Sequence, residues 1–250
     1  MDAIKAVSVL FIAALPLCCA TWVHAEEEHW SYGGHGGPAK WADVDPHFAA
    51  CKLGKLQSPI DIRGAKAADL PAIKFDYKPS PLKVIDNGHT IQVNYAPGSS
   101  IDVGGARYEL VQFHFHKPSE EKIDGKSHAM VAHLVHKNAD GQLAVVAVLL
   151  DKGRANPTID TIWKHLPKEK ERETSVDAPV DAATLLPRNR GYYTFEGSLT
   201  TPPCSEDVRW FVLKTPTRMA ASEIAAFGKL YPMNARPTQP RNGRTIEATR

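Results

Sequence analysis

The stretch Gln112-Phe113-His114-Phe115-His116 decides how the fold is interpreted, because polar and aromatic side chains alternate along it. Alternation with a period of two is typical of a β-strand. On such a strand His114 and His116 lie on one face, while Phe113 and Phe115 lie on the other. Two imidazoles at this spacing can both reach one metal ion. Paired structural or exposed histidines remain an equal alternative for this stretch taken alone.

A second pair of histidines, His133 and His136, lies in the run 131–136. On a strand these two side chains point to opposite faces, whereas on a helix a spacing of three would place both on one face. The β-branched residues of the run and the turn signal Asp140-Gly141 favour a strand that forms a hairpin with the next one. We therefore expect only one of the two, His133, to join the first pair.

Three imidazoles on a sheet, with no thiolate nearby, form a donor set that suits Zn²⁺. Three protein ligands leave the fourth tetrahedral position open, which is typical of catalytic rather than structural zinc. A zinc ion in an open site acidifies its bound water and makes hydroxide available at neutral pH. The pattern predicts Zn²⁺ as the cofactor, held by His114, His116 and His133.

Short alternating runs separated by turn signals dominate the rest of the chain. The expected strands cover 82–85, 90–94, 112–116, 130–135, 143–150 and 208–213. Asn87-Gly88, between the first two, is the strongest hairpin signal. Helical patterns are short, at 158–163 and at 222–230 with Ser222 as the expected N-cap. The predicted fold class is mixed α+β, mainly β: a single domain around a large, mainly antiparallel central β-sheet with short peripheral helices.

The composition excludes several classes of protein. The chain has 250 residues, 43% of them hydrophobic, and a formal net charge of +2. So small a charge gives little electrostatic reason to expect nucleic acid or an anionic membrane surface as a partner. Glycine and proline are too few for a disordered or collagenous chain. These features predict an ordinary globular domain.

Residues 1–25 have the pattern of a secretory signal peptide. Lys5 provides a basic start, 6–17 is apolar, and small residues precede the expected cleavage after Ala25. The alternative is an uncleaved anchor, because the apolar run reaches roughly the lower limit for spanning a bilayer. Cleavage would leave 26–250 as the catalytic domain, with no stable membrane insertion and a periplasmic or secreted location.

The expected cleavage also leaves only two of the four cysteines, Cys51 and Cys204. Two cysteines in an exported protein predict one disulfide. Two free buried thiols are the alternative.

Nearly all of 26–250 resembles the α-class carbonic anhydrases of exported bacterial type. The shared segments, in order, are His29-Trp30-Ser31-Tyr32, Gln57-Ser58-Pro59-Ile60-Asp61-Ile62, Asn87-Gly88-His89, 112–116, Pro118-Ser119-Glu120, His133-Leu134-Val135-His136, Gly197-Ser198-Leu199-Thr200-Thr201-Pro202-Pro203 and Asn234-Ala235-Arg236-Pro237. Any one of these can arise by chance, but not all of them in this order. The resemblance implies reversible hydration of carbon dioxide to bicarbonate and a proton.

The resemblance also implies a role for each matching residue. His114, His116 and His133 correspond to the zinc ligands, Thr200 to the residue that orients the zinc hydroxide, and Glu120 to the residue that orients Thr200. His89 corresponds to the proton shuttle, a task that suits an imidazole with an unperturbed pKa of about 6.5. The wall for the small, apolar substrate corresponds to Val135, Val145, Leu199 and Trp210. Thr201 corresponds to a position that lines the pocket near the bicarbonate product. Gln112 corresponds to a partner that orients a ligand ring, and a water chain is ordered at Tyr32, Asn87 and Gln92.

Members of this family pair the cysteines that match Cys51 and Cys204, and the bridge would brace the loop that carries Thr200. The resemblance further marks Ser58-Pro59 and Pro202-Pro203 as candidates for cis peptide bonds.

Two positions depart from the family pattern. Lys117 stands where many relatives carry an aromatic residue, which we interpret as a surface change of little consequence. Val131 stands where relatives commonly have a glutamate that accepts a hydrogen bond from the third ligand histidine. Loss of such a carboxylate costs about 10–100-fold in metal affinity or activity. A backbone carbonyl or a water molecule remains an alternative acceptor. The other histidines have no expected role in the site: His29, His35, His47, His128, His136 and His165.

Two rival functions remain open. A carbonic-anhydrase-like binding module without metal would lack a ligand, and all three ligand histidines are present. A zinc hydrolase of activated esters would use the same hydroxide. The expected partner is the small molecule carbon dioxide or bicarbonate, without nucleic acid, and a homodimer remains open.

Overall fold

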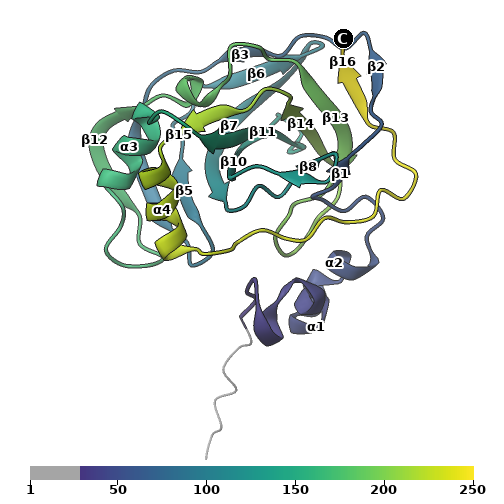
Figure 1. Cartoon of the computed structure of the whole chain (residues 1–250), viewed down its shortest axis with the longest axis horizontal. Helices are drawn as coiled ribbons and strands as arrows, with labels where there is room; N and C mark the ends of the chain where they lie inside the picture. The colour runs from purple at the N-terminus through teal and green to yellow at the C-terminus, as the bar shows by residue number, and fades with distance from the viewer. Residues whose placement is uncertain (1–28) are drawn as a thin grey trace, which may run out of the picture.

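A large twisted sheet occupies the centre of the computed structural model, and short helices lie at its periphery (Figure 1). The structure describes residues 29–250, so the predicted signal peptide at 1–25 lies outside the described residues. Thirteen strands form this sheet, with the path β12-β4-β5-β7-β10-β11-β14-β13-β16-β2 and with β15, β3 and β6 paired off that path. A second, three-stranded sheet has the order β1-β8-β9.

The described elements have the following bounds. The strands are β1 (Asp61–Ile62), β2 (Lys66–Ala68), β3 (Lys74–Asp76), β4 (Ser80–Asp86), β5 (Ile91–Asn94), β6 (Ser100–Val103), β7 (Ala106–His116), β8 (Lys122–Ile123), β9 (Lys126–Ser127), β10 (Met130–Lys137), β11 (Leu143–Lys152), β12 (Thr174–Val180), β13 (Tyr192–Gly197), β14 (Val208–Leu213), β15 (Thr217–Met219) and β16 (Glu247–Thr249). The α-helices are α1 (Trp41–Val44), α2 (Ala50–Leu53), α3 (Pro157–Lys164) and α4 (Ala221–Leu230). Short 3₁₀ turns cover Gly34–Gly36, Pro38–Lys40, Pro46–Phe48 and Ala182–Leu185.

The expected fold class is confirmed, since most neighbouring strands of the large sheet are antiparallel. The parallel pairs in it are β11 with β14, β11 with β15, and β16 with β2. Each of the six expected strands overlaps an observed one. The strand expected at 112–116 begins six residues earlier, at Ala106, because its first half pairs with β6.

The central strands β10 and β11 are buried on both faces, which explains their almost continuous apolar sequence. One face packs with Phe113 and Phe115 into the larger core, under α3 and α4. The other face contributes Val131 and Val135 to a second apolar cluster. The face with this second cluster also carries the ligand-type histidines of β7 and β10.

The hairpin expected at Asn87-Gly88 is present between β4 and β5, where Asp86 pairs with Ile91. Gly88 has a φ of 82°, a left-handed value that glycine adopts without strain. Side-chain hydrogen bonds within the turn come from Asn87, whose Oδ1 accepts from the backbone N–H groups of His89 and Thr90 at 3.1 and 2.9 Å. The turn thereby fixes where His89 leaves the sheet.

The two expected helices are present with small changes at their ends. α3 begins at Pro157, where a missing N–H costs nothing, and Asn156 caps it. The expected N-cap Ser222 is wrong: α4 begins at Ala221, and the Glu223 carboxylate accepts from the backbone N–H of Ala220 at 2.5 Å. A glutamate three residues into a helix can satisfy this N–H without a serine at the cap.

The N-terminal elements α1 and α2 lie below the sheet in Figure 1 and are tied to it by the disulfide between Cys51 and Cys204. Trp41 is fully buried beside this bridge. The predicted pairing of the two cysteines is confirmed. Ser58-Pro59 and Pro202-Pro203 are cis, as expected, and so is Lys117-Pro118. Within 29–250, no helix combines the length and the apolar character needed to cross a membrane.

Candidate metal centre

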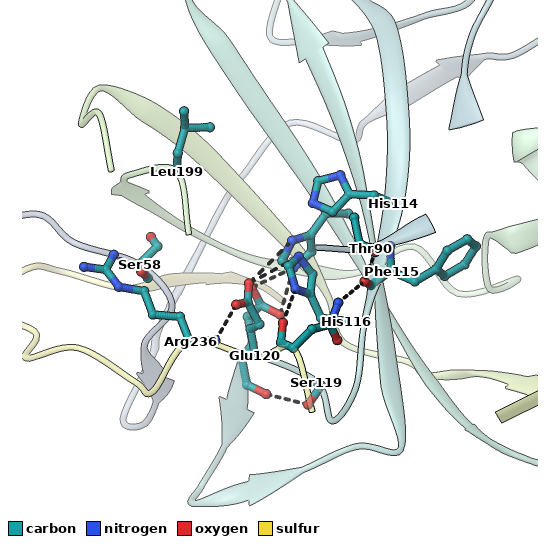
Figure 2. A network of polar contacts seen from close by, with 12 residues as sticks. Ser58, Thr90, His114, Phe115, His116, Ser119, Glu120, Leu199 and Arg236 are labelled. Atoms are coloured by element: carbon teal, nitrogen blue, oxygen red, sulfur yellow. Dashed lines mark hydrogen bonds and ion pairs between the residues drawn. The ribbon is translucent and has the colours of Figure 1, made fainter. Parts of the chain in front are cut away.

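Strand register brings three histidines together on one face of the sheet. β7 and β10 are antiparallel neighbours, and His114 lies directly opposite His133. His116 follows two residues along β7 and therefore points the same way; Figure 2 shows both β7 histidines on one side of the strand and Phe115 on the other. One ligand-type nitrogen of each ring lies within 4.8 Å of the other two. The expected trio is thus assembled.

The helical alternative for 131–136 is wrong, because these residues belong to β10. His136 points to the opposite face from His133, where its Nε2 lies 2.8 Å from the Tyr77 hydroxyl. As expected, this histidine does not join the trio.

Each of the three rings uses one nitrogen on a protein partner. Nδ1 of His114 lies 2.8 Å from Oε1 of Gln112, and Nδ1 of His116 lies 2.8 Å from the backbone oxygen of Asn234. Both oxygens are acceptors, so both rings donate from Nδ1 and keep Nε2 free. His133 is turned the other way, with its Nε2 at 3.1 and 3.2 Å from the two carboxylate oxygens of one glutamate, Glu121. Its Nδ1 is therefore the free nitrogen.

The free nitrogens fit a metal ion. Nε2 of His116 is buried and has no hydrogen-bond partner among the described residues. Burial and the His133 charge lower the pKa of His114 to about 3, and the same two causes hold the pKa of His116 well below its usual value. Both rings are therefore neutral at pH 7, as a metal ligand must be. Three neutral imidazoles without a thiolate are a donor set for Zn²⁺.

The third ring has a different electrostatic environment. Burial lowers the pKa of His133, but the neighbouring Glu121 and Glu120 carboxylates more than offset this and leave it raised. The pKa of two rings of the trio is therefore lowered, while that of the third, beside two carboxylates, is raised.

Of the predicted pair Glu120 and Thr200, the Glu120 carboxylate lies beside the histidines, and Thr200 is buried in the loop between β13 and β14. The Glu120 side chain is fully buried; its Oε1 accepts from the backbone N–H of Arg236 at 2.7 Å, and its Oε2 lies 3.5 Å from Nε2 of His116. Figure 2 shows this carboxylate between the rings and Arg236. Burial and the Glu121 charge together raise the pKa of Glu120 to about 7, against the opposing effects of His133, Thr200 and the Arg236 N–H.

The expected apolar wall lies beside His133. Val135, Val145 and Trp210 are buried in one cluster, and Leu199 is half-buried at its edge. The Trp210 ring stands edge-on to the His133 ring with their centroids 5.0 Å apart. Thr201, which is half-buried, follows in the same loop as Leu199, and its backbone oxygen accepts from the N–H of Cys204.

The structure holds His89 in a stack of rings with Trp30 and His29. Its ring lies parallel to Trp30, with centroids 3.5 Å apart, and its Nε2 is 2.9 Å from Nε2 of His29. Burial, together with the His29 and Lys170 charges, lowers the pKa of His89 to about 4. The pKa of the stacked ring is therefore lower than the unperturbed imidazole value of about 6.5, and the sequence pattern does not reveal the stack.

The residues predicted to order a water chain are Asn87, Gln92 and Tyr32. Asn87 builds the turn, and its Nδ2 donates to Oε1 of Gln92 at 3.4 Å. Gln92 lies opposite His114 in the β5–β7 register. The buried hydroxyl of Tyr32 has no hydrogen-bond partner among residues 29–250, and burial together with the Glu120 charge raises its pKa.

Sequence reasoning missed the role of Asn234, although its segment was noticed. Its backbone oxygen holds His116, and its Nδ2 donates to the backbone oxygens of His89 and Phe115 at 3.0 Å each. One residue therefore connects the His89 turn with a ligand histidine. A sequence separation of more than a hundred residues carries no signal for such a contact. Glu121 was missed for a different reason: in the family pattern Pro-Ser-Glu, the glutamate corresponds to Glu120, and the pattern assigns no role to the residue after it.

Three imidazoles with free nitrogens converge on one face of the sheet, beside a buried carboxylate and apolar side chains. This arrangement fits a metal centre of the histidine-zinc class. Residues 36–250 match the sequence model of the family described as eukaryotic-type carbonic anhydrase. A carbonic anhydrase from Pectobacterium carotovorum is 43% identical over 95% of this chain and 98% of its own length. The chain belongs to this family, the α-class carbonic anhydrases.

Solved structures agree with this assignment. A hyperthermostable carbonic anhydrase identified from an active hydrothermal vent chimney has a TM-score of 0.86 and 45% identity, over 89% of this chain and all of its own. The α-carbonic anhydrase from Thermovibrio ammonificans, in complex with the inhibitor sulfanilamide, has a TM-score of 0.85 and 41% identity, over 89% of this chain and 99% of its own.

Proposed function

We propose that the protein catalyses the zinc-dependent, reversible hydration of carbon dioxide to bicarbonate and a proton. The convergence of His114, His116 and His133, each with one free nitrogen, is the observation that carries this proposal. When bound there, Zn²⁺ lowers the pKa of its water to about 7, the value established for carbonic anhydrase, so that hydroxide is available at neutral pH.

Thr200 and Glu120 orient the nucleophile. An ionised carboxylate can only accept, so the Glu120 side chain takes the hydrogen of the Thr200 hydroxyl and leaves the Thr200 oxygen to accept from the nucleophile. The backbone N–H of Arg236 holds the other Glu120 oxygen at 2.7 Å. Holding the nucleophile's remaining lone pair toward the substrate carbon avoids an entropic cost in the reaction.

Carbon dioxide is small and carries no charge, so it needs an apolar surface and no ionic clamp. Val135, Val145, Leu199 and Trp210 provide that surface next to His133. Thr201 offers a polar group at the edge, where the bicarbonate product forms. The apolar side chains thus contact the uncharged substrate, and the Thr201 hydroxyl contacts the anionic product.

His89 moves the proton that each hydration releases. In its stack against Trp30, with a pKa of about 4, the ring is neutral at pH 7 and gives up a proton readily to solvent. The stacked imidazole is a weak base, so the His89 ring has to leave the stack before it can take up the proton. The Asn87-Gly88 turn supplies the point about which the side chain swings between pocket and solvent.

We place the protein outside the cytoplasm, in the periplasm or secreted, after cleavage of the signal peptide at 1–25. The Cys51–Cys204 disulfide supports an oxidising compartment. The proposed partner is the small-molecule substrate alone, with a homodimer left open.

Stopped-flow hydration of carbon dioxide with a pH indicator tests the proposal. We expect catalysis that a zinc chelator abolishes and added Zn²⁺ restores. His114→Gln should remove the activity, while the matched control His136→Gln, a buried histidine of the same sheet on the opposite face, should retain it. An absence of chelator-sensitive hydration would overturn the enzyme proposal and favour a metal-free binding module. Faster turnover of an activated ester than of carbon dioxide would favour the hydrolase instead.

A further inference from the structure

Glu121 is a fully buried carboxylate that the proposed reaction does not use. It lies between β7 and β8, directly after Glu120, and both of its oxygens face Nε2 of His133 at 3.1 and 3.2 Å. Its backbone is fixed as well, because the Ser119 hydroxyl donates to the Glu121 backbone oxygen at 2.8 Å. The carboxylate is thus built into the site rather than free to turn elsewhere.

The electrostatic surroundings of Glu121 point to a cation beyond His133. Within 29–250 its only ion-pair partner is the His133 ring. A buried carboxylate without a compensating charge costs several kcal/mol. A neutral imidazole compensates this charge weakly, whereas an imidazole bound to a divalent cation is polarised and donates a stronger hydrogen bond. A metal on the other nitrogen of the ring would strengthen the compensation of this buried carboxylate.

Val131 explains why the carboxylate comes from this loop. On β10 it lies two residues before His133 and therefore on the same face, where it is fully buried in an apolar cluster. Relatives commonly have a glutamate at this position. The resemblance therefore implied that valine here weakens metal binding. The structure instead brings a carboxylate to the same ring from position 121.

We propose that Glu121 is the positioning residue of the metal centre: it accepts the Nε2–H of His133 and so presents Nδ1 of that ring to the metal, in place of a carboxylate at Val131. This inference rests on the proposed zinc site, though not on the reaction. The carboxylate that accepts the hydrogen bond from His133 is thus retained, but it comes from the loop at position 121 instead of strand β10.

The first test is the zinc affinity of the full protein, measured by competition with a chromophoric chelator at fixed pH. Glu121→Ala should weaken the affinity by about 10–100-fold. The zinc affinity of Glu121→Gln should lie between those of Glu121→Ala and the parent, because an amide oxygen accepts the same hydrogen bond without the charge.

In the zinc-loaded protein, the proton NMR signal of the His133 Nε2–H should shift upfield in Glu121→Gln, because a neutral acceptor forms a weaker hydrogen bond.

A carboxylate restored on the strand provides the decisive rescue. In the Glu121→Ala background, Val131→Glu should recover most of the lost zinc affinity, since position 131 shares a face with His133. A residue that acted only on folding would not be rescued in this way. The matched control is Glu223→Gln, another buried carboxylate, which binds the backbone N–H groups of Asn156 and Ala220 instead. Its zinc affinity should equal that of the parent.

Two results would overturn the inference. One is a zinc affinity within twofold of the parent for both single variants at position 121. The other is a folded double variant that binds zinc no more tightly than Glu121→Ala; if the double variant does not fold, an unmoved Nε2–H signal in Glu121→Gln overturns the inference in its place. Because these readouts need no carbon dioxide, Glu121-dependent zinc binding without hydration would reject only the proposed reaction.

Discussion

Removing the disulfide between Cys51 and Cys204 should cost the protein much of its heat tolerance and little of its activity at 25 °C. The two cysteines are 153 residues apart. In the chain-entropy model, closing a loop of this size stabilises the fold by about 5 kcal/mol. A domain of this length loses about 2–4 °C of Tm per kcal/mol, so the expected fall in Tm is roughly 10–20 °C.

The loop that carries Thr200 should keep its place without the bridge, because hydrogen bonds hold both cysteine backbones. Nε2 of Gln57 donates to the backbone oxygen of Cys204, and Nη2 of Arg236 donates to that of Cys51, both at 3.0 Å. These bonds do not depend on the sulfur atoms. Hydration at 25 °C should therefore stay within about twofold of the parent, since the cross-link acts mainly on the unfolded chain.

The assay compares thermal unfolding and stopped-flow hydration for the oxidised parent, the reduced parent and the double variant Cys51→Ala, Cys204→Ala. The reduced parent keeps both buried sulfur atoms, so its difference from the double variant isolates the lost packing. A Tm within 3 °C of the oxidised parent after full reduction would refute the entropic reasoning. Loss of hydration in a reduced protein that still gives a native circular dichroism spectrum would refute the role assigned to the hydrogen bonds.

His89→Ala should slow hydration mainly in dilute buffer, and added imidazole should restore the rate; equal rates at all buffer concentrations would contradict the shuttle. Burial lowers the pKa of His136 to about 4. As the pH falls, this histidine therefore binds a proton near pH 6.5 in the unfolded chain but only near pH 4 in the folded protein. The free energy of unfolding should therefore fall as the pH drops through this window, by about 3 kcal/mol from this group at most. His136→Gln should flatten that part of a urea-unfolding profile, and an unchanged profile would argue against this group as the cause. Arg236→Met should destabilise the protein by about 3 kcal/mol, because the buried guanidinium donates to three acceptors that would lose their partner; a urea midpoint equal to the parent's would contradict this.

Local pattern was sufficient for most of the fold. Alternation along 112–116 places His114 and His116 on one face whatever the rest of the chain does, because the pleat of a strand has a period of two. The Asn-Gly turn and the β-branched runs defined strands in the same local way. The segments shared with carbonic anhydrases then pointed to the family, which the comparisons confirm over 36–250.

Contacts between distant segments were decided only by the tertiary structure. The pairing of His114 with His133 depends on the register between two strands, and the low pKa of His89 depends on rings brought to it from the N-terminal segment. Val131 suggested a missing carboxylate, but the ring next to it meets Glu121 from a loop. Residue type and spacing along one strand determine which face a side chain takes. Which partner meets it there depends on how the rest of the chain closes over that face, and a local pattern does not contain this information.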